Sequence, residues 1–352
     1  MIVMSAERVM VYGAAGHTGR FVVEELTRRG LVPVLAGRNA DRLANVAASY
    51  PGLEQRVFGV DDARTVRESL AGIDVVVNCA GPFLDTGLPL ARAAVEGGTH
   101  YLDVTAEQPA VQQLYQELDL PARDAGVAVV PAMAFYGGLA DLLVTTALDG
   151  GTDADAVEVA IGLDHWWPTT GTRVTGERNT ATRQVIRDGV LTPMPDPAPT
   201  GTWSYAAPLG EQAVVQLPFS EVPVIDRHLR VGALTSYLNS APLAELRDGS
   251  TPSPTAADET GRSAQRFVVE VVVRVGSTVR RLSASGRDIY AVTAPIVCEG
   301  VVRLLDGRRR AIGAVAPGEA FDAADVLDAL AAHSAGIELE RSMTSESAAP
   351  IP

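Results

Sequence analysis

The sequence contains no lysine, so all 29 of its strongly basic residues are arginine. Without a lysine the chain cannot form a Schiff base with a substrate or use an ammonium group as a general acid. Cysteine is scarce as well, since only Cys79 and Cys298 occur in 352 residues. Two cysteines do not make a disulfide framework, and their scarcity favours a reducing, cytoplasmic environment.

Three further features that the sequence lacks exclude certain partners and ligands. No apolar run is long enough to span a bilayer, and residues 1–5 lack the pattern of an export signal, so no membrane partner is expected. The formal net charge of −14 argues against nucleic acid or an anionic membrane surface as a partner. Histidine, cysteine and acidic residues show no metal-ligand spacing, so we predict no metal site.

A glycine turn near the amino terminus is the feature around which the chain is organised. Residues 9–12 favour a strand, Gly13, Gly16 and Gly19 follow with G-x-x-G-x-x-G spacing, and an apolar-periodic helix comes next. Strand, turn and helix open a dinucleotide-binding unit, with a structural turn that holds no ligand as the alternative. Small glycines and free helix N–H groups would let the backbone hold a pyrophosphate. The residues expected to hold it are Gly13, Ala14, Gly16, His17, Thr18 and Gly19.

The residues that follow the next strand occupy the position at which a dinucleotide site distinguishes NAD from NADP. An NAD site places an acidic residue there for the ribose 2′-hydroxyl, whereas this sequence has Arg38 and Asn39. A guanidinium suits a 2′-phosphate, so NADPH is favoured over NADH, with a solvated surface arginine as the alternative. Asp61, which follows a third strand, is expected near the adenine.

Strands and helices alternate up to about residue 132, which fits a doubly wound parallel sheet. The expected strands lie at 9–12, 31–36, 56–60, 74–78 and 127–131, with another beginning at 100, and the expected helices at 63–70, 88–97 and 111–125. Ligands of such sheets bind beyond the carboxyl ends of the strands. Ala80, Gly81, Pro82 and Asp103 should therefore border the nicotinamide. We expect Cys79 to pack as a small apolar residue rather than to act as a nucleophile.

After about residue 134 the pattern changes. Residues 156–163 alternate as a half-buried antiparallel strand does, and 267–275 with 278–284 form a hairpin around Gly276 and Ser277. Loops are expected at 191–201 and 248–263, and helices at 290–305 and 323–333. The expected fold is α/β, with an amino-terminal Rossmann domain and a second, mixed α/β domain that contains an antiparallel sheet.

This pattern divides the chain into four segments. They are a Rossmann domain that binds NADP (1–133), a substrate and dimerisation domain (134–285), a carboxyl-terminal segment with helices (286–341) and a disordered tail (342–352). The exposed strands that such a second domain would have suggest a homodimer.

Hydride transfer to a substrate also needs a proton donor. The missing lysine excludes the Tyr-x-x-x-Lys pair of short-chain dehydrogenases. The remaining candidates are Tyr136, which opens a helix past the last parallel strand, His165, which precedes two tryptophans, and Asp103 at a strand end. A tyrosine that anchors domain packing is the alternative for Tyr136. If the substrate carries a carboxylate or phosphate, one of Arg173, Arg178 and Arg183 would clamp it, with solvated surface arginines as the alternative.

Several of these motifs together resemble the saccharopine dehydrogenase-like oxidoreductases, a family that includes saccharopine reductase and bacterial trans-acting enoyl reductases. The matching segments are Gly13–Gly19, Ala36–Arg38, Asn78–Phe83, Gly98–Asp103, Asp288–Ala294 and Ala316–Ala320. The resemblance implies an NADP-binding Rossmann domain, a mixed α/β second domain and a carboxyl-terminal segment that packs back on the first. The middle of the chain, where substrate identity would lie, matches no known pattern.

The leading expectation is an NADPH-dependent oxidoreductase that reduces a C=C, C=O or C=N bond of a small, fairly apolar metabolite. The alternative is a non-catalytic NADP(H)-binding redox sensor that acts through a protein partner. The long second domain favours the enzyme, because a sensor needs no cleft of substrate size.

Overall fold

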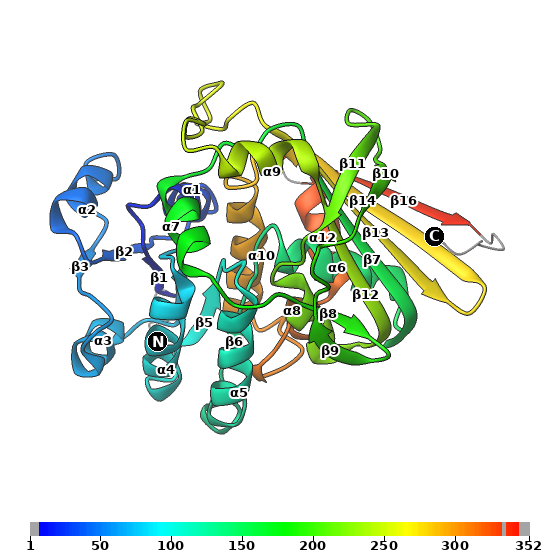
Figure 1. The fold of residues 1–352 in the computed structure, drawn as a ribbon. Helices are drawn as coiled ribbons and strands as arrows, with labels where there is room; N and C mark the ends of the chain where they lie inside the picture. Colours follow the sequence, from blue (N-terminus) through cyan, green and yellow to red (C-terminus); the bar gives the residue numbers. More distant parts are fainter. Residues whose placement is uncertain (1–6, 333–335, 345–352) are drawn as a thin grey trace.

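The computed structural model describes residues 7–332 and 336–344. One of its two sheets consists of seven parallel strands. Among these residues the strand order is β15-β6-β5-β4-β1-β2-β3. Figure 1 labels β1, β2, β3, β5 and β6 of this sheet. The strands are β1 (Val9–Tyr12), β2 (Val34–Gly37), β3 (Gln55–Val57), β4 (Val75–Asn78), β5 (His100–Asp103), β6 (Ala128–Val130) and β15 (Gly313–Ala314). The order reverses direction between β1 and β4, which is where ligands of doubly wound sheets bind. The predicted fold class is confirmed.

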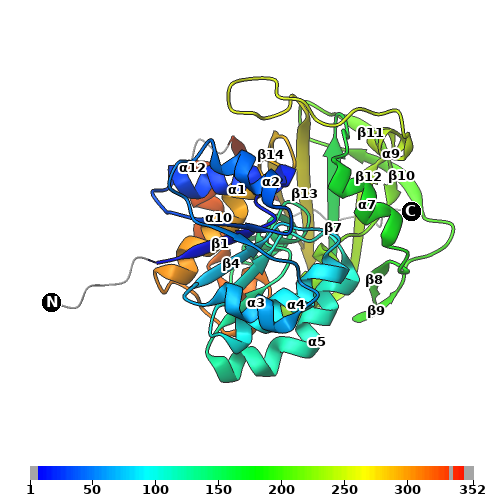
Figure 2. The same ribbon diagram turned by 90° about the vertical axis from the view of Figure 1, so that its left-hand side faces the viewer.

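Helices cover both faces of this sheet, and β1 shows why its sequence is continuously apolar. Val9 and Val11 pack in one core with α1 and α10, whereas Met10 and Tyr12 pack in a second core with α3, α4 and α5 (Figure 2). A strand buried on both faces has no polar side to alternate with. The helices are α1 (His17–Arg28), α2 (Ala40–Ala47), α3 (Ala63–Leu70), α4 (Phe83–Glu96), α5 (Gln108–Ala125) and α10 (Thr293–Leu305).

Three helix starts differ from the prediction, and one is that of α10, which begins at Thr293 rather than Tyr290. Helix α4 begins at Phe83, five residues before the predicted Leu88, directly after the turn that follows β4. Helix α5 begins at Gln108 rather than Val111, with Pro109 in its first turn, where a proline is well tolerated because the first N–H groups have no helical partner. The strand β2 begins only at Val34, after Pro33.

The second sheet is mixed, in the order β10-β11-β12-β7-β13-β14-β16 within the described residues, with β8 and β9 paired beside β12. Its strands are β7 (Asp153–Leu163), β8 (Gln184–Arg187), β9 (Val190–Pro193), β10 (Thr200–Ser204), β11 (Glu211–Gln216), β12 (Arg230–Asn239), β13 (Arg266–Val275), β14 (Thr278–Arg287) and β16 (Ile337–Thr344). The predicted hairpin is β13 and β14. The antiparallel prediction for residues 156–163 holds on one side only, because β7 pairs antiparallel with β13 but parallel with β12.

The ends of several predicted segments are corrected by this sheet. Residues 191–201 are not one loop, since β9 runs to Pro193 and β10 starts at Thr200, whereas 248–263 contains no helix or strand, as predicted. The predicted tail is wrong at residues 342–344, because these extend β16 along β14 and gain a ladder partner. Residues 345–352 and His333, the predicted end of the last helix, lie outside the described residues.

Six helices remain among the described residues. They are α6 (Gly137–Leu148), α7 (Thr170–Arg178), α8 (Glu221–His228), α9 (Ser240–Arg247), α11 (Pro317–Ala320) and α12 (Ala323–Ala332). Helix α6 is buried almost all round, in the same core as the inner residues of β7 and β13. In the described part of the chain, no helix is both long and apolar enough to cross a membrane.

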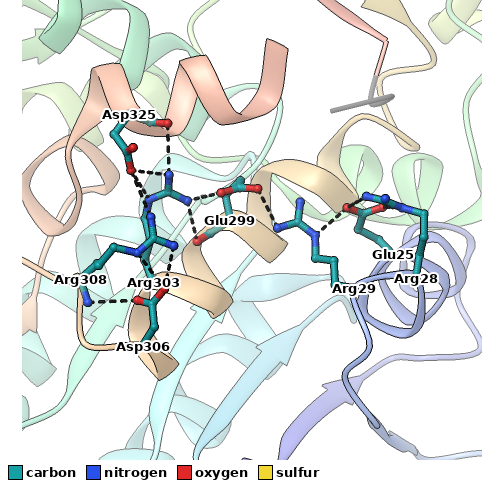
Figure 3. A network of polar contacts seen from close by, with 8 residues as sticks. All are labelled: Glu25, Arg28, Arg29, Glu299, Arg303, Asp306, Arg308 and Asp325. Carbon is teal, nitrogen blue, oxygen red and sulfur yellow. Dashed lines mark hydrogen bonds and ion pairs between the residues drawn. The ribbon is translucent and has the colours of Figure 1, made fainter. Parts of the chain in front are cut away.

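A chain of ion pairs ties α10 to α1 and α12 (Figure 3). The Glu299 carboxylate lies between two arginines, with Oε1 2.7 Å from Arg29 Nη1 and Oε2 paired with Arg303. Arg29 continues to Glu25 at 2.7 Å, and Arg303 to Asp325 at 2.6 Å. The side chains of Arg29, Glu299 and Arg303 are 9%, 5% and 1% exposed, so these three charges are buried, whereas Asp325 is 54% exposed. The network holds α10 against α1 and α12. Tyr290, which precedes α10, lies beside the glycine turn, since its ring centre is 5.3 Å from that of His17.

Candidate functional site

A cleft of about 1010 Å³ lies at the reversal point of the parallel sheet. Its lining begins at the glycine turn after β1, passes the ends of β2 and β4, and reaches an aromatic chamber beside the second sheet. Helix α7 lines the opposite side and touches the first domain, where Arg178 Nη1 lies 2.9 Å from Asp85 Oδ2. The carboxyl ends of parallel strands are the ligand-binding edge of such folds.

The glycine turn is too tightly packed to hold side chains. Gly13 has φ +85°, and a Cβ on it would lie 2.9 Å from the backbone nitrogen of Ala80. A Cβ on Gly19 would lie 2.1 Å from the carbonyl oxygen of Gly13. Gly13, Gly16, His17 and Thr18 line the cleft, whereas Ala14 and Gly19 are buried beneath it. The turn therefore presents backbone to the cleft, as a pyrophosphate requires.

Replacing Gly19 with alanine is expected to destabilise the fold by about 1–3 kcal/mol, because the new methyl group would meet backbone that cannot rotate away. The same shift of the turn should weaken binding of NADP⁺. Urea unfolding and calorimetry measure the two effects. Gly201→Ala is the matched control, since an added Cβ there meets nothing within 4 Å. A Gly19→Ala variant as stable as the wild type would contradict the close packing.

Arg38 and Asp61 line the end of the cleft that the sequence assigns to the adenosine. Both side chains are exposed, and Arg42 adds a second guanidinium, which reaches to 3.4 Å from the carbonyl oxygen of Ala15. Asn39 lines the cleft too, but its Oδ1 accepts a hydrogen bond of 2.9 Å from the Arg42 backbone N–H and caps α2. Two arginines therefore stand where a 2′-phosphate would be recognised.

The turn after β4 borders the other end of the cleft through Ala80, Gly81 and Pro82. Below them Asp103 is fully buried and accepts hydrogen bonds from Tyr101 Oη at 3.0 Å and from the backbone N–H of Ala132 at 2.8 Å. Burial raises the pKa of Asp103 to about 6. The side chain does not line the cleft, so the structure places Asp103 under its floor, where it joins the turns after β5 and β6.

Four aromatic residues form a chamber at this end of the cleft. The Tyr136 ring stacks on Phe219 at 4.3 Å between centroids and lies 6.1 Å from Trp166. Tyr290 closes the group, since its hydroxyl lies 3.2 Å from Trp166 Nε1 and 2.9 Å from Thr172 Oγ1 of α7. Burial raises the pKa of both tyrosines, so their hydroxyls stay protonated at neutral pH.

His165 lies apart from this chamber. Its Nδ1 is 2.8 Å from Glu245, its ring stacks on Trp167 at 5.1 Å, and its side chain is 50% exposed. Neither His165 nor Trp167 lines the cleft, although Trp166 between them does. The structure therefore brings Tyr136 to the cleft and turns His165 away from it.

Three polar atoms of cleft residues are buried without a hydrogen-bond partner among the described residues: His17 Nε2, Glu107 Oε2 and Tyr136 Oη. Such atoms are rare because a lost hydrogen bond is costly, and a ligand that supplies partners removes the cost. Glu107 is only 2% exposed, and its other oxygen accepts a hydrogen bond of 2.8 Å from the Phe83 backbone N–H. Together with the glycine turn, these atoms fit a dinucleotide that runs the length of the cleft.

Sequence reasoning did not place several residues of this lining. Thr169 to Asn179 form one wall, but a segment rich in threonine and glycine gave no sign of a helix that faces the cleft. Tyr290 and Phe219 reach the chamber from distant parts of the chain. Glu107 is the exception, because the strand end that carries Asp103 and Glu107 is where the sequence places the substrate or nicotinamide.

The amino-terminal domain matches a described family. Residues 9–130 match the saccharopine dehydrogenase NADP binding domain. The match covers about a third of this chain. The resemblance expected from the motifs is confirmed, and the match supports a nicotinamide dinucleotide as the cofactor.

The similarity to curated relatives also extends over only part of the chain. The chain is 32% identical over 151 residues to a lipid droplet localized protein of Caenorhabditis elegans, covering 40% of this chain and 35% of that protein. It is 30% identical over 145 residues to a trans-acting enoyl reductase of Mycobacterium bovis, covering 39% and 34%. The human saccharopine dehydrogenase-like oxidoreductase is 28% identical over 152 residues, covering 38% and 35%. The matches therefore span about a third of the length of these relatives.

A solved structure extends the likeness to the whole fold. Apo saccharopine dehydrogenase (L-Glu forming) from Saccharomyces cerevisiae has a TM-score of 0.66 and 13% sequence identity, and the match covers 96% of this chain and all of that one. The shared architecture includes the second, mixed domain. At this identity the likeness concerns the fold alone.

Proposed function

We propose that the chain binds NADPH in the cleft and reduces a C=C, C=O or C=N bond of a small, fairly apolar metabolite. The observation that carries the proposal is one continuous cleft, which joins a glycine turn and two arginines at one end to an aromatic chamber at the other. The saccharopine dehydrogenase-type domain supports the nicotinamide cofactor, and Arg38 supports the preference for its 2′-phosphate form.

The residues that would hold the cofactor follow from the lining. The glycine turn lines the cleft, and the backbone N–H groups of His17 and Thr18, at the start of α1, can bind the pyrophosphate, whereas those of Gly13 and Gly16 donate within the protein. Arg38 offers its guanidinium to the 2′-phosphate. Gly81 and Pro82 border the nicotinamide end, where Glu107 Oε2 can accept a hydrogen bond from an amide. When bound, the reduced cofactor supplies the hydride.

The aromatic chamber supplies the rest of the chemistry. Trp166, Phe219 and Tyr290 exclude water, which strengthens the electrostatic contacts of a substrate that enters the chamber. The Tyr136 hydroxyl is protonated and has no partner in the described residues, so it can donate its proton to the atom that gains charge during reduction. Tyr136 is therefore the proposed proton donor.

Replacing Arg38 with alanine is expected to weaken NADP⁺ binding by about 10- to 100-fold and to leave NAD⁺ binding unchanged, because only NADP⁺ carries the phosphate that the guanidinium would hold. Calorimetry with both cofactors measures the difference. Arg64→Ala removes an arginine that is 81% exposed and paired with Glu68, and serves as the control.

Two other outcomes would change the proposal. If the wild-type protein binds neither form of either cofactor, the proposal is wrong. If it binds NADPH but turns over none of a panel of enones, ketones and imines, the redox-sensor function replaces the enzyme. A homodimer through the second sheet and a cytoplasmic location stay predictions, of which gel filtration tests the first.

A further inference from the structure

Arg183 brings a positive charge into the aromatic chamber. It lies between α7 and β8 and lines the cleft, and its guanidinium carbon is 4.9 Å from the centre of the Phe219 ring. The same ring stacks on Tyr136 at 4.3 Å. The charge therefore lies within one aromatic ring of the proposed proton donor.

The guanidinium of Arg183 has few hydrogen-bonding or charged partners among the described residues around it. Its Nη1 donates a hydrogen bond of 2.5 Å to the carbonyl oxygen of Pro218. In residues 7–332 and 336–344 no ion pair to Arg183 is formed, whereas Arg178 of the same segment pairs with Asp85. Glu221 attracts the charge from a distance, but its two oxygens accept hydrogen bonds of 2.9 and 3.1 Å from the Phe219 backbone N–H.

The surroundings of the Arg183 guanidinium favour the binding of an anion beside it. Partial burial lowers the pKa of Arg183, so its surroundings disfavour the charged form. A charge that is partly removed from water is normally paired, because losing hydration without a partner is costly. Among the described residues the planar guanidinium has further N–H groups without a partner, and its fork matches the two oxygens of a carboxylate. A single arginine balances a single negative charge.

We propose that the substrate is a monocarboxylate whose anionic group binds Arg183 while its apolar body packs against Tyr136, Trp166 and Phe219. This inference rests on the proposed function for the reaction, but it names the substrate class from the chamber alone. The carboxylate fixes the orientation, and the aromatic rings provide the contact area for the bond that is reduced.

The test compares acids with their neutral amides. The probes are trans-cinnamate and trans-2-hexenoate, each beside its primary amide, with binding measured by calorimetry with and without NADP⁺. Wild-type protein is expected to prefer the acids. Arg183→Gln should weaken acid binding by about 10- to 100-fold and leave amide binding unchanged, because it removes a charge-assisted hydrogen bond that only the acids make. Arg183→Lys should restore part of the preference, since it keeps the charge but loses the fork.

Arg187→Gln provides the matched control, because Arg187 lies on β8 four residues away, is exposed and does not line the cleft. Equal affinity of the wild type for acids and amides, or no binding of either acid, would overturn the inference. So would tighter binding of phenyl phosphate than of cinnamate. If NADP⁺ does not bind but the acids do, the proposed function fails and the anion site remains. If NADP⁺ binds but the protein shows no preference for acids over amides, the proposed function remains and the anion site at Arg183 is wrong.

Discussion

Replacing Tyr136 with phenylalanine is expected to lower the turnover number by about 100- to 10,000-fold, the usual contribution of a positioned general acid. The ring would keep its stacking on Phe219, so the shape of the chamber should not change. NADP(H) affinity should stay as in the wild type, because the hydroxyl lies in the aromatic chamber and not at the glycine turn. Steady-state kinetics on any substrate found in the panel, together with calorimetry, measure both quantities.

The same variant separates the catalytic role from an anchoring role. The Tyr136 hydroxyl has no hydrogen-bond partner in the described residues, so removing it should not lower the free energy of unfolding. A tyrosine that anchors the two domains through its hydroxyl would lose stability on the same substitution. Lower stability together with unchanged turnover would therefore assign Tyr136 to domain packing.

Tyr115 provides a closely matched control. It is buried, its hydroxyl also lacks a partner in the part of the chain that the structure describes, and it does not line the cleft. Tyr115→Phe makes the same chemical change at the same kind of site, and it is expected to leave turnover unchanged. A similar fall in both variants would show that the loss arises from the fold and not from proton transfer.

The first domain could be predicted closely because its signals are local. Strands such as β1 and β4 are buried on both faces and therefore read as short continuous apolar runs. Helix α3 was predicted with its observed bounds, since Asp62 caps its first turn by accepting from the Thr65 backbone N–H at 3.0 Å. The glycine turn needs only neighbouring residues to specify it.

The second domain and the chamber depend on contacts that a local pattern does not contain. The alternation of β7 is the same whether its neighbour runs parallel or antiparallel, so only the fold shows that β12 is parallel to it. Residues 342–344 became a strand because β14 offers them a ladder. Tyr290 and Arg183 line the same cleft but lie more than 100 residues apart in the chain. The sequence around one of them does not predict that the other lies in the same site. His165 shows the converse, because its place in the sequence made it a candidate proton donor, whereas in the structure only its neighbour Trp166 lines the cleft.

Replacing Glu299 with glutamine is expected to lower the free energy of unfolding by about 3–5 kcal/mol, because it removes the negative charge that two buried arginines share. Arg29 and Arg303 have side chains only 9% and 1% exposed, and both pair with this carboxylate (Figure 3). Glutamine keeps the size and one acceptor oxygen, so the effect isolates the charge. Urea unfolding measures it.

The control is Glu68→Gln, because Glu68 pairs with Arg64 at the same four-residue spacing on a helix, with side chains 64% and 81% exposed. Its loss should cost about 0–1 kcal/mol, since water screens an exposed pair. Changing both Glu299 and Arg303 to leucine should recover part of the lost free energy of unfolding. Arg29 still pairs with Glu25, and Asp325, which is 54% exposed, can be hydrated once Arg303 is gone. Equal effects at Glu299 and Glu68 would contradict the view that the interior charges bind α10 to α1. In that case apolar packing alone would have to hold Tyr290 beside the glycine turn.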